Sequence, residues 1–329
     1  MPCIIYKYLS IYCRIEIIMD IISIILVVLG LCVFEIVSSV DNAVVNADVL
    51  ATMGKKARRW FLVWGIFIAV FVVRGLLPWF IVWLANPALG PISALTATFS
   101  NDPAILESVE RTAPMLLLAG GMFLVLLFSH WLFLEEKAFG FKFEKYISSK
   151  GFWFFALTSV ISSTVVWLAL KQDPILAFAS TIGTTAFFVI YGFKEQAAKA
   201  EENLKNQHLS DISKLLYLEV LDATFSIDGV VGAFAFTLSV PLIILGNSFG
   251  AIIVRQFTIK GVDKIRKYLY LKNGAMYSIG VLGTLMVLES FGLDVPSYVS
   301  PLITFSVIGF FLWKSVKHIK AEQKAGSLA

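Results

Sequence analysis

The chain contains 329 residues, of which 58% are hydrophobic and only 15% are charged, and its mean hydropathy is +0.82. Soluble domains are roughly 45–50% apolar, so this composition excludes a soluble globular enzyme and predicts an all-α polytopic protein embedded in membrane lipid. The net charge of +4 arises from Lys and Arg in short segments between apolar runs. Such a distribution of charge indicates how the chain is oriented in the membrane. It does not form the basic face that nucleic acid binding needs, so nucleic acid is not expected as a partner.

Stretches of about 20 apolar residues predict membrane-spanning helices. Residues 1–18 mix polar and apolar side chains and are predicted to be a non-structural extension, with Met19 as the true start and residues 19–329 as one membrane domain. Residues 193–214 are the longest polar stretch and are predicted to form a cytoplasmic linker. We expect nine spans, over residues 21–50, 60–85, 113–134, 151–171, 174–192, 212–238, 241–259, 273–291 and 298–314.

Basic residues gather after every second predicted span, as at 55–59 after the first span and 260–272 after the seventh. Loops rich in Lys and Arg lie on the cytoplasmic side of a membrane. This pattern places the N-terminus outside and Ala329 in the cytoplasm. We expect the protein in the inner membrane of a bacterium, and its oligomeric state is left open.

Two predicted spans, the first and the sixth, carry matching polar interruptions. Each has two carboxylates six residues apart, and each is followed by a span that contains one Arg. Because five spans separate the two helices, they would cross the membrane in opposite directions. The pattern predicts an inverted repeat of residues 21–134 and 212–291, with spans at 151–192 and 298–314 outside it. The residues concerned are Glu35, Asp41 and Arg74 in the first half and Asp222, Asp228 and Arg255 in the second.

The spacing of these carboxylates also predicts a backbone feature. Six residues along a regular α-helix leave two side chains roughly 120° apart and ~9 Å along the axis, so the members of a pair could not share one ion. Unwinding of the backbone would turn both inward, and Ser, Asn and Asp can bond the freed backbone groups. We therefore expect discontinuous helices at 38–42 and 226–229.

Charge counting favours a cation as the substrate. Four ionised carboxylates and two Arg leave a net charge of −2 within the predicted spans, which one divalent cation or two protons would neutralise. Carboxylate, amide and hydroxyl oxygens favour Mg²⁺, Mn²⁺ or Ca²⁺ over softer metals. The predicted metal ligands are Glu35, Asp41, Asp222, Asp228, Asn42 and Ser39. Residues expected around them or at the entrance are Ser38, Ser226, Asn46, Asn247 and Glu219, and Arg74 and Arg255 are the expected structural counter-charges.

The two polar motifs resemble signatures of the TerC-like integral membrane proteins, in particular a long branch of uncharacterised bacterial members. Residues 35–42 read EIVSSVDN, similar to the family's Glu followed by Leu-Ser-x-Asp-Asn, with Ser38 where Leu is usual. Residues 219–228 and 247–255 resemble the second signature and the helix that follows it, with Gly229 where the family carries Ser. The resemblance implies a metal-ion exporter, often for manganese, with an association to tellurite resistance.

Three functions are therefore considered, none of which needs a catalytic cofactor. The first is a secondary transporter that exports a divalent cation, with manganese as the first candidate. The second is a non-transporting accessory membrane protein that holds a structural cation. The third is an intramembrane aspartyl protease in which Asp41 and Asp228 share a proton, although two nearby Arg would oppose such sharing.

Overall fold

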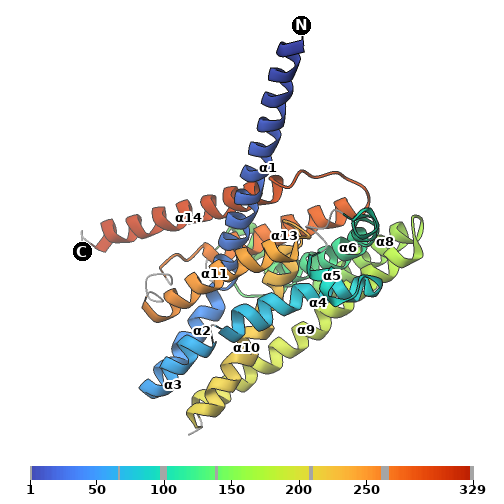
Figure 1. Cartoon of the computed structure of the whole chain (residues 1–329). Helices are drawn as coiled ribbons and strands as arrows, with labels where there is room; N and C mark the ends of the chain where they lie inside the picture. Colours follow the sequence, from blue (N-terminus) through green and yellow to red (C-terminus); the bar gives the residue numbers. More distant parts are fainter. Residues whose placement is uncertain are drawn as a thin grey trace.

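The computed structural model describes residues 2–65, 67–96, 102–137, 140–206, 210–260 and 267–326, without the side chains of residues 2–19 and of a few others, Asp41 among them. The described elements are helical throughout, and they form one bundle with the first part of α1 projecting from it (Figure 1). The long helices are α1 (Pro2–Ser38), α6 (Pro103–Leu134), α8 (Trp153–Leu170), α9 (Pro174–Asn206), α10 (Asp211–Ala233), α11 (Val240–Lys260), α13 (Leu271–Ser290) and α14 (Val299–Gly326).

Shorter helices fill the first third of the chain and the connection after α6. Two of them, η1 (Phe61–Gly65) and η2 (Ile68–Leu76), are π-helical, a geometry that often marks functional sites. The others are α2 (Val40–Ala51), α3 (Lys55–Trp60), α4 (Leu77–Ala85), η3 (Pro87–Leu89), α5 (Pro91–Thr96) and α7 (Lys142–Ser148).

Seven helical segments among the described residues are long and apolar enough to cross a membrane, which supports the prediction of an integral membrane protein. The seven are Asp20–Ser38, Glu107–Leu134, Trp153–Leu170, Pro174–Gln196, Val240–Thr258, Leu271–Ser290 and Val299–Gln323. The predicted spans 60–85 and 212–238 are not among them. The first is divided into short helices with only Val72–Ala85 as an apolar segment, and α10 carries several charged side chains. The count of nine, the inverted repeat and the orientation stay predictions.

The first predicted helix break is present, and the second is not. Helix α1 ends at Ser38 and α2 begins at Val40, with Ser39 between them at φ −91° and ψ 3°. Helix α10 continues without interruption through residues 226–229, so the prediction of unwinding there is wrong. The hydroxyl of Ser226 donates to the carbonyl oxygen of Asp222 at 2.5 Å, so its polar group is satisfied within the intact helix.

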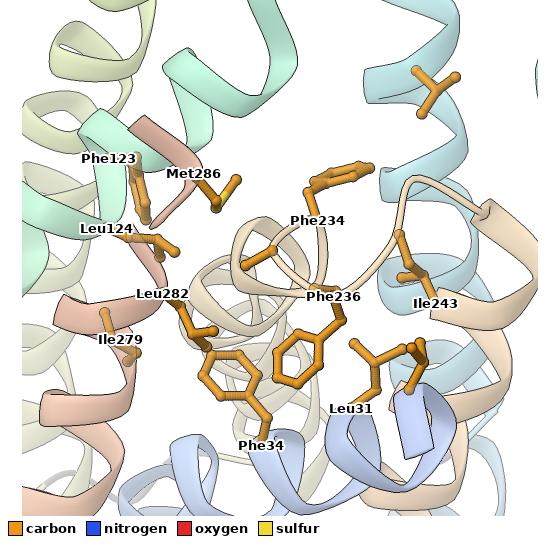
Figure 2. Close-up of a cluster of buried hydrophobic side chains, with 14 of the residues drawn as sticks. Leu31, Phe34, Phe123, Leu124, Phe234, Phe236, Ile243, Ile279, Leu282 and Met286 are labelled. Carbon is orange, nitrogen blue, oxygen red and sulfur yellow. The ribbon is translucent and has the colours of Figure 1, made fainter. Parts of the chain in front are cut away.

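The main buried cluster joins α1, α6 and α13 to the segment after α10 (Figure 2). Phe34 and Phe236 lie with their ring centroids 5.6 Å apart, and Leu282 and Met286 reach the same cluster from α13. Helices α6 and α13 approach closely, because a Cβ on Gly121 would lie 2.9 Å from the carbonyl oxygen of Gly283. Small residues of this kind let helix backbones approach each other in membrane proteins.

Most of the described residues in 193–214, the stretch expected as a cytoplasmic linker, belong to long helices, and its place on the cytoplasmic side stays a prediction. Helix α9 runs without interruption from Pro174 to Asn206, and α10 begins at Asp211. Residues 207–209, between these two helices, and the side chains of residues 197–206 lie outside the description. The continuous helix places Lys194 against the bundle, and this position is important for the site below.

Candidate functional site

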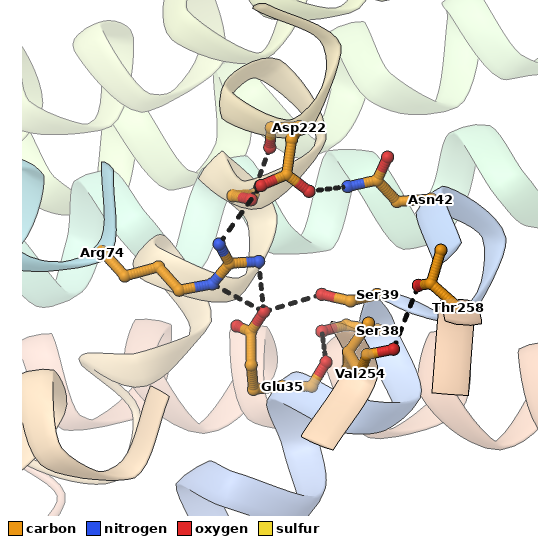
Figure 3. A network of polar contacts seen from close by, with 9 residues as sticks. Glu35, Ser38, Ser39, Asn42, Arg74, Asp222, Val254 and Thr258 are labelled. Atoms are coloured by element: carbon orange, nitrogen blue, oxygen red, sulfur yellow. Dashed lines mark hydrogen bonds and ion pairs between the residues drawn. The ribbon is translucent and has the colours of Figure 1, made fainter. Parts of the chain in front are cut away.

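A buried ion pair links α1 to η2. The Nε and Nη2 atoms of Arg74 lie 2.8 and 2.6 Å from the same carboxylate oxygen of Glu35, Oε1 (Figure 3). Ser39, at the break between α1 and α2, donates its hydroxyl to this oxygen at 2.7 Å. Glu35 is 0% and Arg74 2% exposed, so the pair is removed from solvent and lipid.

Arg74 also reaches the carboxylate of Asp222 on α10. Its Nη1 lies 3.5 Å from Asp222 Oδ2, while Asn42 on α2 donates its side-chain amide to Asp222 Oδ1. One guanidinium therefore joins two of the predicted ligands from elements that are about 190 positions apart in the sequence. We call Glu35, Ser39, Asn42, Arg74 and Asp222 the Glu35–Arg74–Asp222 cluster.

Two glycines bring neighbouring helices onto Glu35. A Cβ on Gly229 of α10 would lie 2.6 Å from Glu35 Oε2, and a Cβ on Gly250 of α11 would lie 2.6 Å from Glu35 Cβ. Gly229 stands where the TerC-like motif carries Ser. The structure gives a reason for the glycine, since a Cβ there would collide with the Glu35 carboxylate.

Arg255 and Glu219 form a second, looser pair. Arg255 Nη2 lies 3.8 Å from Glu219 Oε1, and the guanidinium lies over the ring of Phe61 at 3.7 Å. Gly65 leaves the room for this pair, because a Cβ there would collide with Glu219. Arg255 therefore pairs with Glu219, a residue expected only around the metal site or at its entrance. Arg255 does not pair with Asp228, the second carboxylate of the motif on α10.

Asp228 is paired with a residue that the sequence analysis placed in the linker. Lys194 Nζ on α9 lies 2.5 Å from Asp228 Oδ2, and the two side chains are 13% and 17% exposed. The sequence contained a clue to this pair, because Lys194 directly follows the apolar run 174–193. A helix that continued through this run would keep Lys194 beside the bundle. The ion pair of Asp228 is therefore with α9. The side chain of Asp41, the remaining predicted ligand, lies outside the description.

Several buried polar atoms of the predicted site residues have no hydrogen-bond partner. Most buried polar atoms in proteins are bonded, so a group of unbonded ones indicates a place for water, a proton or a cation. Nearly all of the atoms here are oxygens. In the described part of the chain they include Glu35 Oε2, Asn42 Oδ1, Asn46 Oδ1, both carboxylate oxygens of Glu219, Asp222 Oδ2, Asp228 Oδ1, and both amide atoms of Asn247.

The described side chains contain no group of three or more His, Cys, Asp and Glu arranged to hold a metal ion. The carboxylates are held apart, because Arg74 lies between Glu35 and Asp222 and Lys194 holds Asp228. The ionised carboxylates of these pairs carry four negative charges, and their basic partners carry three positive charges, so the net charge is −1. An ionised Asp41 makes the net charge −2. The site keeps a negative balance.

Comparison with protein families shows which family the chain belongs to. Residues 40–322 match the family described as protein of unknown function DUF475. The chain belongs to this family. DUF475 is a membrane protein family distinct from the TerC-like proteins, so the resemblance inferred from the two motifs is wrong, and the expectations of manganese export and tellurite resistance lose their basis. No curated protein and no solved structure matches this DUF475 member.

Proposed function

We propose that the chain transports a small hard cation across the membrane through the Glu35–Arg74–Asp222 cluster. The observation that carries this proposal is the set of buried carboxylate oxygens without hydrogen-bond partners, on Glu35, Asp222, Asp228 and Glu219. Ionised side chains inside a membrane are costly, and they usually mark ion or proton pathways. Oxygen atoms of carboxylates and amides are the ligands that cations such as Mg²⁺, Mn²⁺ or Ca²⁺ prefer.

We further propose that α10 and residues 60–85 cross the membrane, which gives nine spans. With 23 residues, α10 would be about 34 Å long, enough for a hydrocarbon core of about 30 Å. Three of its acidic residues, Asp222, Glu219 and Asp228, face Arg74, Arg255 and Lys194 respectively. Its outward stripe is apolar, since Ile212, Leu216 and Val220 are 70%, 63% and 63% exposed. This arrangement agrees with a span that turns its charges away from lipid. The N-terminus outside stays part of the proposal.

Arg74 would hold the two carboxylates in the state without substrate. It neutralises Glu35 and Asp222 together, so a cation that enters between them must displace the guanidinium from at least one. Movement of Arg74 would then couple cation binding to a shift of η2 against α1 and α10. The π-helical geometry of η2 is a backbone form that often accompanies such sites.

The protease alternative is disfavoured by Lys194. An aspartyl dyad needs two carboxyl groups that share a proton, whereas Asp228 forms an ion pair with Lys194 at 2.5 Å. An accessory role with a structural cation needs the same oxygen ligands, and transport measurements distinguish it from the proposal.

The test uses the purified protein in liposomes loaded with a fluorescent metal indicator. Wild-type protein should carry at least one of Mg²⁺, Mn²⁺ and Ca²⁺ faster than empty liposomes, and Glu35→Gln and Asp222→Asn should lose most of this flux. Glu289→Gln, on α13 and outside the cluster, is the matched control and should retain it. Absence of flux for every ion, with folded wild-type protein in the membrane, would reject the transport proposal and favour the accessory role.

A further inference from the structure

A groove lies at the start of α10, on the outside of the bundle and away from the Glu35–Arg74–Asp222 cluster. It has a volume of about 600 Å³ and is lined by α3 and the first turns of α10. Its walls are mostly apolar, with Trp60 from α3 facing Ile212 and Leu216 from α10. These three side chains are 41%, 70% and 63% exposed, so the groove opens to the surroundings of the protein.

One basic side chain lines this groove, and others lie on the same helix. Lys56 forms part of its wall, and Lys55 and Arg59 lie on the same short helix. All three are exposed, and none has an ion pair within the part of the chain that the structure describes. The neighbouring Arg58 differs, because it donates to the carbonyl oxygens of Met53 and Ala51 at the end of α2.

One acidic residue lines the groove, and its carboxylate has a partner. Asp211 Oδ2 accepts a hydrogen bond from the backbone N–H of Gly54 at 3.2 Å. This contact fastens the start of α10 to the turn between α2 and α3. The groove is lined by one Lys and one Asp, and Lys55 and Arg59 elsewhere on α3 make this end of the bundle positive.

The apolar surface continues beyond the groove along the bundle. On α10 the stripe runs through Val220, and Val63 and Trp64 extend it on η1, with exposures of 63%, 58% and 55%. A ligand that fits this surface needs an anionic head for Lys55, Lys56 and Arg59 and a long apolar tail for the stripe. Trp60 lies where the two parts meet, the position that Trp prefers at the interface of a membrane.

We propose that this groove binds one anionic phospholipid, with its phosphate at Lys55, Lys56 and Arg59 and an acyl chain along the α10 stripe. Clusters of basic residues beside membrane helices attract anionic lipid. A free phosphate would use only the basic part of the surface, and a zwitterionic lipid would use mainly the apolar part. This lipid site is independent of cation transport.

Binding should stabilise the packing of α3 on α10. Beneath the groove, Ala57, Phe61, Leu215 and Leu218 form a buried cluster with Val49, Leu50 and Met53 of the α2 segment. A ligand that bridges α3 and α10 binds the folded state alone and so raises its stability with increasing concentration.

The experiment measures the melting temperature of the purified full chain in detergent during titration with phosphatidylglycerol. We expect a concentration-dependent increase for the wild type, and less than half of that increase for the double variant Lys55→Gln, Lys56→Gln. The double variant Arg111→Gln, Lys171→Gln loses the same charge elsewhere and should keep the full increase. An equal increase with phosphatidylcholine, with inorganic phosphate, or in the Lys55→Gln, Lys56→Gln variant would overturn the proposal.

A second readout locates the lipid without depending on stability. Brominated phosphatidylglycerol quenches a Trp that it contacts, so the wild type should lose more fluorescence with it than with brominated phosphatidylcholine. We expect this difference to shrink in Trp60→Phe and to persist in Trp167→Phe, a Trp on α8 that lies beside Lys171. Identical quenching differences in the two variants would place the anionic lipid elsewhere.

Discussion

Lys194 Nζ lies 2.5 Å from Asp228 Oδ2, and this contact joins α9 to α10 beside the Glu35–Arg74–Asp222 cluster. Both side chains are more than four-fifths buried, so removal of one partner would leave the other charge poorly solvated. The pair also accounts for one of the carboxylates that the sequence placed in a metal site. Its properties can be tested separately from transport.

Lys194→Gln should lower the free energy of unfolding by about 3 kcal/mol, since Asp228 would lose its counter-charge. The double variant Lys194→Gln, Asp228→Asn should recover part of the loss, and a double-mutant cycle of detergent-denaturation midpoints measures the coupling. Lys150→Gln is the control, because that side chain is exposed. Additive effects of the two substitutions would show that the ion pair contributes nothing.

Arg74 should tolerate neither loss of charge nor loss of its planar fork. Three of its nitrogen atoms face two carboxylates, a geometry that an ammonium cannot reproduce. Arg74→Ala should sharply reduce the yield of monodisperse protein, and Arg74→Lys should give an intermediate yield. Fluorescence-detected size-exclusion chromatography measures both, with Arg111→Lys as an exposed control. Wild-type yield from Arg74→Ala would show that the two carboxylates need no counter-charge.

Gly229→Ala should destabilise the protein by about 1–3 kcal/mol, because its Cβ would lie 2.6 Å from Glu35 Oε2 and overpacking has costs of this size. Gly309→Ala on α14 is the matched control. A Cβ there meets nothing within 4 Å, so higher helix propensity should make that variant neutral or slightly more stable. Thermal melting of the two variants gives the comparison, and equal melting temperatures would contradict the close approach at Gly229.

The sequence predicts part of this architecture, and the reasons for the rest are physical. Apolar runs identify the long helices, because charged side chains are costly in lipid. The charges inside those runs identify Glu35, Asp222 and Arg74 as residues of a polar site. Pairing between charges depends on how the helices pack. Spacing alone could not show that Arg255 faces Glu219 or that Lys194 reaches Asp228. The prediction of a helix break at 226–229 was wrong, because the Ser226 hydroxyl donates to the carbonyl oxygen of Asp222 within the continuous helix α10.

Glu144 illustrates a buried charge that the sequence did not single out. It is 0% exposed and accepts hydrogen bonds from the hydroxyl of Tyr277 at 2.8 Å, the side-chain amide of Asn273 at 3.0 Å and the backbone N–H of Phe141 at 2.9 Å. Its carboxylate therefore fastens α7, in the connection after α6, to α13. Sequence alone places Glu144 in a charged loop, where an acidic residue is normally solvated.

Tyr277→Phe should lower the free energy of unfolding by about 2 kcal/mol, because a hydrogen bond to a charged group contributes about 1.5–3 kcal/mol. Glu144→Ala should cost more than Tyr277→Phe, since it leaves two side-chain donors and one backbone donor without their acceptor. Tyr146→Phe is the matched control, because Tyr146 is 68% exposed and surface substitutions usually stay within about 0.5 kcal/mol. Denaturation midpoints in one detergent measure all three variants. If Tyr277→Phe matched Tyr146→Phe, the hydroxyl would not contribute to holding α7 on α13.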